Sequence, residues 1–141
     1  MSGTPILPPH LCHCNDCRSI SGSTFSHSVI YKAGALKIIQ GEHQITNYES
    51  TADTYRPFCS SCGCHIYKQA PKKGVVIIYP NLFDTVNTGN PLPQEWVPKR
   101  HIYYKSRAHG YEYDDHIEFY DHAPKQLGGD DVQVNYQGSK L

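Results

Sequence analysis

The sequence has no long apolar run and no excess of either charge. None of its apolar runs approaches the roughly 18 residues of a transmembrane helix. Thirteen basic residues balance thirteen acidic ones, so the formal net charge is zero and nothing attracts nucleic acid or an anionic membrane in general. We therefore expect a soluble protein with neither of these partners.

The amino terminus lacks the parts of a secretory signal. Residues 1–10 carry no basic start, no apolar run of about seven residues and no small-residue cleavage site. We therefore expect a cytoplasmic protein, whose thiols are kept reduced and remain available as metal ligands.

Hydrophobic residues are scarce, at 38% of the chain, and eleven tyrosines supply much of that apolar material. A chain of 141 residues is long enough for one domain with one core. The hydrophobic core is nevertheless expected to contain few apolar side chains, so a bound metal ion would help to stabilise the domain.

Short segments rich in β-branched and aromatic residues run through the chain and predict a mainly β fold. Most are bounded by Gly, Pro, Asn or Lys, as expected for strands joined by turns. One acidic stretch, residues 113–120, is expected to hold a helical turn. The predicted strands are residues 26–31, 36–40, 44–49, 53–58, 65–69, 75–79 and 101–105.

No repeat, low-complexity tract or break in composition divides the chain before about residue 123. We therefore predict one domain over residues 1–123. The remaining residues, 124–141, include Gly128, Gly129 and Gly138 and are predicted to form a loosely held tail.

Six cysteines fall into two tight groups, and cysteines one or two residues apart are poorly placed to form disulfides with each other. The first group, Cys12, Cys14 and Cys17, places three thiols within six residues. Soft thiolates suit zinc, and the sequence lacks the more extended run of cysteine ligands that an iron-sulfur cluster would need. We therefore predict zinc as the cofactor, with these three cysteines as ligands.

The fourth position of that zinc ion has two interpretations. His13 stands between two ligands and is expected to turn away from a metal that they share, which leaves the position open, as in catalytic sites. Alternatively, two Cys-x-x-Cys pairs form a closed ribbon of four thiolates, a common structural pattern. The four ligands would then be Cys14, Cys17, Cys59 and Cys62.

Two motifs and several single residues fall in a recognisable order. The motifs are CHCNDCR at residues 12–18 and RPFCSSCG at residues 56–63. The single residues are Ser21, Gly22, Ser23, Phe25, Gly41, Tyr48, Ser50, Pro98, His101 and Ile102. In this order they resemble the glutathione-dependent formaldehyde-activating family, which also includes centromere protein V. The resemblance covers most of the chain.

This resemblance implies a β-tent of small antiparallel sheets with zinc knuckles and few or no helices. It also implies two zinc sites. Cys12, Cys14 and Cys17 would hold a catalytic zinc, whereas Cys59 and Cys62 would supply half of a structural one. The other half in the family is an amino-terminal Cys-x-Cys pair, and the eleven residues before Cys12 contain no cysteine. The usual first strands are therefore expected to be absent.

Three explanations are open for the missing pair. The gene model starts late, the protein has discarded the site, or Cys64 and His65 complete it. On an extended segment Cys62 and Cys64 would stand about 6.6 Å apart, so sharing a metal needs Gly63 to bend the chain. The competing interpretation is that Cys64 is a small buried hydrophobe and His65 an ordinary strand residue. Loss of the first strands would leave a sheet edge that invites a homodimer.

A zinc ion with three thiolate ligands and one open position favours a sulfur atom as its fourth ligand. A substrate thiol in that position would be deprotonated and could add to an aldehyde or leave from a thiohemiacetal. The resemblance implies the same chemistry, because the family's members are classed as carbon-sulfur lyases and their named reaction joins glutathione to formaldehyde, giving S-hydroxymethylglutathione. The expected partner is therefore a small-molecule thiol or thiohemiacetal.

His101 is the predicted catalytic residue, because proton transfer at the hemiacetal oxygen would benefit from a general acid or base near the metal. Arg18 and Arg56 are candidates to hold a substrate carboxylate, or to pair with a nearby acid. Ser21 and Ser23 are expected to shape the turn after the first motif, because no histidine-carboxylate relay is identifiable beside them.

Two functions of different classes follow. The first is a zinc-dependent carbon-sulfur lyase, and the alternative is a non-enzymatic, zinc-stabilised binding module of the centromere protein V type. A module that binds nucleic acid or microtubules would be expected to carry a lysine-arginine block, which this chain lacks. That absence favours the enzyme. The substrate itself depends on loops such as residues 80–98.

Overall fold

The computed structural model describes residues 1–83 and 88–129. The chain divides into two compact units, each of which draws on two stretches of sequence. Unit 1 comprises Met1–Leu7 and Ser28–Trp96, and unit 2 comprises Pro8–His27 and Val97–Leu141.

Unit 1 is built on an antiparallel sheet with the strand order β2, β8, β7, β5, β4. A separate antiparallel pair joins β3 to β6. The strands are β2 (Ser26–Lys32), β3 (Ile45–Thr46), β4 (Glu49–Thr51), β5 (Thr54–Tyr55), β6 (Phe58–Cys59), β7 (Tyr67–Ala70) and β8 (Val75–Ile78).

The core of unit 1 forms where β2 and β8 pair. All four residues of β8 are β-branched, and four side chains of the two strands, Val29, Tyr31, Val76 and Ile78, cluster with Trp96. The Trp96 indole N–H donates a buried hydrogen bond to the Tyr31 hydroxyl, with a nitrogen to oxygen distance of 2.7 Å. This bond satisfies the polar atoms of two large side chains inside an apolar cluster.

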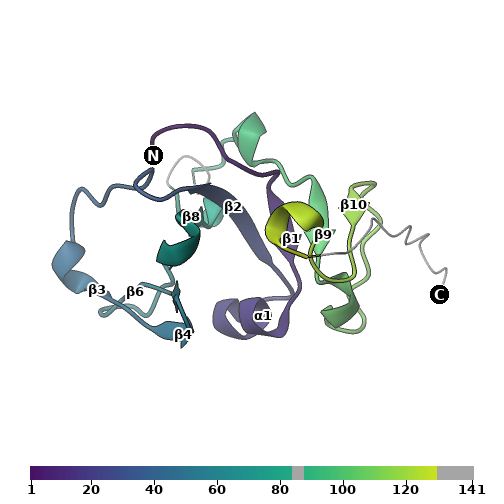
Figure 1. Cartoon of the computed structure of the whole chain (residues 1–141), viewed down its shortest axis with the longest axis horizontal. Coiled ribbons are helices and arrows are strands. Elements are labelled where there is room, and N and C mark those ends of the chain that lie inside the picture. Colours follow the sequence, from purple (N-terminus) through teal and green to yellow (C-terminus); the bar gives the residue numbers. More distant parts are fainter. Residues whose placement is uncertain (84–87, 130–141) are drawn as a thin grey trace. The chain divides into compact units, whose positions relative to one another are not determined.

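Unit 2 contains a short parallel ladder in which β9 (Arg100–Ile102) lies between β1 (His10–Cys12) and β10 (Glu118–Phe119), as Figure 1 shows. Helix α1 (Asn15–Ser21) follows β1 almost directly. It ends at Gly22, whose φ of 60° is the left-handed conformation that glycine adopts without strain.

The remaining regular structure is short. Among the described residues, every helix is too short or too polar to cross a membrane. Single turns of 3-10 helix occur at Glu42–Gln44, Pro71–Lys73, Pro80–Leu82, Gln94–Trp96, Tyr104–Ser106 and Lys125–Leu127.

The predicted fold class is confirmed: the protein is mainly β, with small sheets and one α-helix. The pairs of β9 with β1 and β10 are parallel rather than antiparallel. No hairpin dictates the direction of the β1 and β9 pair, because 87 residues separate the two strands.

Three predicted or overlooked elements need correction. Residues 36–40 form no strand, and their Ile39 is 90% exposed, because β propensity without a neighbouring strand to pair with does not make a ladder. Residues 113–120 hold β10 instead of a helical turn. Helix α1 was not predicted, since seven residues are too few to show a helical period.

The division into a domain of residues 1–123 and a tail of residues 124–141 stays a prediction. Within that tail, Lys125–Leu127 forms a 3-10 helix. Residues 130–141 lie outside the described part of the chain, as do residues 84–87 of the loop at residues 80–98.

Replacing Tyr31 by Phe should lower the free energy of unfolding by about 1 to 3 kcal/mol, because the buried Trp96 N–H loses its acceptor. Denaturant unfolding measures this as a lower midpoint with an unchanged m-value. The matched control is Tyr111→Phe at a side chain that is 55% exposed, with an expected change within about 0.5 kcal/mol. Equal effects of the two substitutions would contradict the prediction.

Candidate metal centre

The structure brings the three thiols of the first motif together in unit 2. The sulfur atoms of Cys12, Cys14 and Cys17 all lie within 4.8 Å of one another. Neighbouring sulfurs of a tetrahedral zinc with Zn–S bonds of about 2.3 Å stand roughly 3.8 Å apart, so small side-chain rotations would suit an ion. Among the described residues, this is the one group of three or more Cys, His, Asp or Glu side chains close enough to share a metal.

Two elements of backbone structure bring the thiols together. Cys12 ends β1, where it pairs with Ile102 of β9, and the His13 N–H donates to the Ile102 carbonyl at 3.0 Å. Cys14 then leaves the strand and caps helix α1, with its sulfur accepting a hydrogen bond from the Cys17 N–H at 3.4 Å. The cap places the Cys14 sulfur beside the first turn of α1, and that turn carries Cys17.

The electrostatics of the three thiols suit a cation. The pKa of the Cys12 thiol is raised far above its usual range, first by hydrogen bonds with Cys14 and Cys17, then by burial and by repulsion between the sulfurs. Three thiolates this close cannot all ionise without a compensating charge. A divalent cation supplies that charge and binds thiolate sulfur, so the donor set fits zinc.

Apolar and aromatic side chains surround the cysteines. Ile102 is buried against Cys12 and Cys17, and the partly buried Tyr103, Tyr120 and Leu127 pack on the same cluster. Cys12 and Cys17 are buried, whereas Cys14 is only half-buried. The more accessible side of the triplet is therefore that of Cys14.

Tyr103 adopts a left-handed backbone, with φ at 54°, although it is not glycine. Its N–H donates to the His122 carbonyl at 2.6 Å, which helps to hold this conformation. Such strain costs on the order of 1 to 3 kcal/mol and persists where the surrounding structure fixes it, often at functional sites.

His101, the predicted catalytic residue, lies on β9 with no exposed surface. Its Nδ1 is 2.8 Å from Nε2 of His13, a second fully buried histidine. Its Nε2 is 2.9 Å from Oδ2 of Asp115, whose side chain is 39% exposed. The three side chains form a hydrogen-bonded chain from the surface to the residue between two of the metal-centre cysteines.

Aromatic rings enclose both histidines. The His13 ring lies 5.7 Å from Phe25, 5.1 Å from Tyr104 and 5.5 Å from Tyr113, centroid to centroid. His101 stacks on Phe119 at 4.5 Å. Rings in such an enclosure have little freedom to reorient.

Burial disfavours the charged form of both histidines. It lowers the pKa of His13 to about 4, helped by the positive potential of His101, Arg107 and Arg18 and opposed by the Thr24 backbone. Burial also lowers the pKa of His101, against the opposing effect of Asp115.

The second cysteine group lies in unit 1. Backbone N–H groups of Cys62 and Ser61 donate toward the Cys59 sulfur and lower its pKa, as expected for a knuckle that presents a thiolate. Among the described residues, no third metal-binding side chain joins Cys59 and Cys62 within sharing distance. Their role as half of a structural zinc site stays a prediction.

Two neighbours of this knuckle were also interpreted from the sequence. The interpretation of Cys64 as a buried hydrophobe is wrong, because Cys64 is exposed, with its thiol oriented toward the His65 carbonyl at 3.6 Å. His65 makes an isolated bridge with Phe58, and burial lowers its pKa.

The two arginine candidates have different surroundings. The Arg18 side chain donates to the His13 carbonyl at 3.2 Å and to the Asn15 side chain at 2.7 Å, so it braces the cysteine loop. Arg56 is buried in unit 1, where its Nε donates to the Ser50 hydroxyl at 3.0 Å. A carboxylate-binding role for either arginine stays a prediction.

The serines after the first motif shape the turn, as expected. Ser21 donates to the Cys17 carbonyl at 2.7 Å, at the end of α1. Ser23 donates to the Phe25 carbonyl at 2.8 Å, just after Gly22.

Sequence reasoning missed Asp115 and the part played by His13. The alternation of side chains on a strand places His13 opposite Cys12 and Cys14, which agrees with its turning away from the metal but does not identify its partner. Asp115 gave no signal, because it stands in a run with Glu112, Asp114 and other polar residues.

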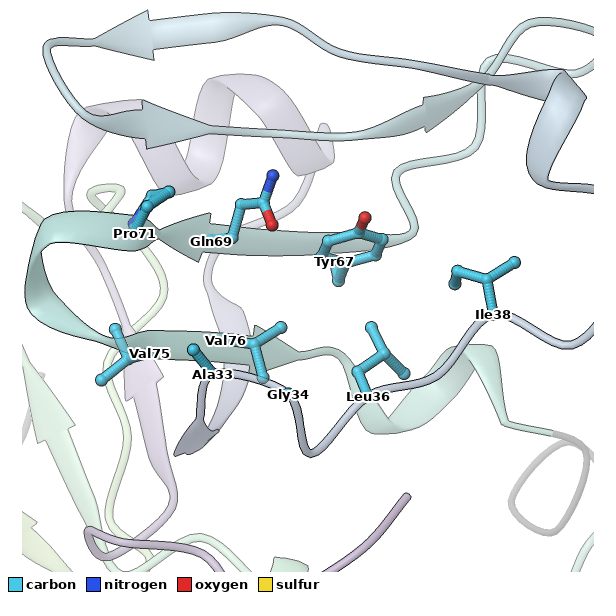
Figure 2. A pocket seen from close by; sticks show the side chains of 9 residues that line it. All are labelled: Ala33, Gly34, Leu36, Ile38, Tyr67, Gln69, Pro71, Val75 and Val76. Carbon is cyan, nitrogen blue, oxygen red and sulfur yellow. The ribbon is translucent and has the colours of Figure 1, made fainter.

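A separate pocket lies in unit 1, where β7 and β8 face the segment of residues 33–38 (Figure 2). Tyr67 and Gln69 supply its larger polar side chains. It carries no cysteine, histidine or carboxylate, so the chemistry of the cysteine triplet has no counterpart there. The lining residues are Ala33, Gly34, Leu36, Ile38, Tyr67, Gln69, Pro71, Val75 and Val76.

Comparison with known proteins adds a family match. The sequence model of the family described as glutathione-dependent formaldehyde-activating enzyme matches residues 1–106, which include all six cysteines and His101 but not Asp115.

Two curated fungal relatives are each provisionally named a glutathione-dependent formaldehyde-activating enzyme. The one from Talaromyces marneffei is 30% identical over 93 residues, which cover 63% of this chain and 50% of the relative. The one from Colletotrichum graminicola is 29% identical over 86 residues, covering 58% and 45% respectively. The chain therefore spans about half the length of these relatives.

The stability of the metal-free protein should fall as the pH drops from about 6.5 to about 4. In that interval the unfolded chain binds a proton at His13 that the folded protein excludes, so one such group contributes a slope of at most about 1.4 kcal/mol per pH unit. Chemical denaturation at several pH values measures the slope. The slope should be smaller in His13→Gln, and an equal slope in both proteins would refute the assignment.

Proposed function

The chain belongs to the glutathione-dependent formaldehyde-activating family, and on that premise we propose that it is a zinc-dependent carbon-sulfur lyase acting on a thiol-aldehyde adduct. One observation carries the proposal. Three thiol sulfurs converge within 4.8 Å, and no fourth metal-binding side chain joins them among the described residues. Three protein ligands with one position left for substrate is the pattern of catalytic zinc sites.

The chain's own residues would hold the ion and shape access to it. Cys12 and Cys17 close the buried side of the site, and the half-buried Cys14 marks the side from which a substrate approaches. Tyr103 and Tyr120 pack beside the cysteines and limit the entry of water. When bound, zinc supplies a Lewis acid that accepts a sulfur ligand and lowers the pKa of a thiol.

The proposed reaction balances without an oxidant or reductant. In the synthetic direction the substrate sulfur adds to the carbonyl carbon, a carbon-sulfur bond forms, the carbon-oxygen π bond breaks and the oxygen takes a proton. The lyase direction reverses each change. The names of the two relatives make glutathione and formaldehyde the first pair to test for this chain.

In the proposed enzyme, His101 has a supporting role. Its ring has no exposed surface and bonds to His13 and Asp115, so it acts through these neighbours and not by contact with substrate. The proton for the hemiacetal oxygen then comes from water or from the substrate thiol itself.

Metal content tests the ligand set. We expect zinc bound at the triplet of the wild-type chain and its loss in Cys14→Ser, because removing one of three thiolates weakens the site. Cys64→Ser should keep this zinc and is the matched control, since Cys64 is an exposed cysteine outside the triplet. Elemental analysis of the purified proteins gives zinc per chain.

The variant Cys59→Ser separates the open triplet from the closed ribbon of four thiolates. The open triplet predicts that Cys59→Ser keeps the zinc bound by Cys12, Cys14 and Cys17. Loss of the same single zinc ion in both Cys14→Ser and Cys59→Ser would support the closed ribbon and would refute the open three-cysteine site.

Turnover tests the reaction. The zinc-loaded chain should form or break down S-hydroxymethylglutathione faster than the spontaneous reaction, and Cys14→Ser should be slower by about 100-fold or more, because a Lewis acid contributes several kcal/mol. Exchange spectroscopy that follows the adduct directly measures both rates.

Cys64→Ser again serves as the control and should retain the wild-type rate. A zinc-loaded chain with no rate above the spontaneous one, across several thiols and aldehydes, would reject the lyase. That outcome would favour the alternative, a zinc-stabilised binding module of the centromere protein V type.

A further inference from the structure

His13 makes hydrogen bonds at both of its backbone groups and at its ring. Its N–H donates to the Ile102 carbonyl at 3.0 Å, and its carbonyl accepts from Arg18 at 3.2 Å. Its Nε2 lies 2.8 Å from His101. Because Cys12 and Cys14 are its two chain neighbours, a shift of the His13 backbone moves both thiols.

The ring bond of His13 continues to the surface through the buried His101. His101 bonds to Oδ2 of Asp115 at 2.9 Å and to Oδ1 at 3.2 Å. Both histidines are fully buried, so the partly exposed Asp115 is the member of the chain that meets solvent. An ionised carboxylate accepts hydrogen bonds only, which gives the chain a direction.

That direction assigns the ring protons. Asp115 accepts a hydrogen bond from His101 Nε2–H, so a neutral His101 presents a lone pair at Nδ1 and accepts from His13 Nε2–H. The other nitrogen, His13 Nδ1, is buried and has no partner at hydrogen-bond geometry, although the Thr24 backbone raises the pKa of His13 as a nearby acceptor would.

We propose that Asp115 is a positioning residue for the metal centre: through His101 it fixes the tautomer and orientation of His13, and His13 in turn holds the Cys12 and Cys14 thiols in place. A carboxylate that orients a histidine beside a metal usually bonds to a ligand directly. Here the carboxylate acts through two rings on a residue placed between ligands. The inference rests on the proposed function only in taking the cysteine triplet as the metal site.

The tautomer is the first test. A long-range proton-nitrogen spectrum of the metal-free chain, assigned with His13→Gln and His101→Gln, should show His13 protonated at Nε2 alone and His101 at Nε2 alone. In Asp115→Ala the His101 ring loses its acceptor, so both rings should show mixed tautomers. A His13 ring protonated at Nδ1 in the wild type would overturn the proposal.

Zinc affinity is the second test, measured by competition with a chromophoric chelator. Asp115→Ala should bind zinc about 10- to 100-fold more weakly than the wild type, the usual effect of losing a residue that orients a metal site. Asp115→Asn keeps an oxygen acceptor for His101 and should recover most of the affinity. A purely structural role of the carboxylate charge would leave Asp115→Asn as weak as Asp115→Ala, which would contradict the proposal.

The adjacent Asp114 supplies the matched control. It is 75% exposed and lies 3.8 Å from the exposed His116, so Asp114→Ala removes the same charge from the same loop. It should leave zinc affinity and both histidine spectra unchanged. Equal losses in Asp114→Ala and Asp115→Ala would reduce the effect to general electrostatics and overturn the proposal. Neither test uses turnover, so a chain with these properties and no lyase activity would refute the proposed function alone.

Discussion

The parallel pairing of β1 with β9 is the constraint on which unit 2 depends. It sets Leu11 beside His101 and Cys12 beside Ile102, residues that are 90 positions apart in the sequence. On one side of this ladder Ile102 packs against the cysteines, and on the other His101 meets His13. A single register therefore positions both the thiols and the histidine chain behind them, and a slip of one residue would exchange the two sides.

The sequence identified the thiols but not their support. Local spacing was enough for Cys12, Cys14 and Cys17, because three ligands within six residues converge through one strand end and one helical turn. It was also enough for a mainly β fold. Parallel pairing between distant segments and the partner of His101 depend on tertiary structure, which no local pattern encodes, and Asp115 was overlooked for that reason.

The two cysteine groups differ in what surrounds them. The triplet has two buried cysteines, aromatic neighbours and a cap bond to the third thiol, which together restrict the positions of the sulfurs. Cys62 and Cys64 are exposed, and Cys59 owes its lowered pKa to backbone donors in its own turn. The proposed lyase would benefit from the first environment, because the direction of the ligands would be set before a substrate arrives.

The position of Asp115 has a consequence for how such a centre diversifies. Its side chain stands at the surface, in a segment beyond residues 1–106 that match the family, yet it connects to the residue between two of the thiols. Substitutions there change no ligand and open no cavity in the core. The affinity of the centre can thus drift or be engineered from outside, while the set of thiols that defines its chemistry is left intact.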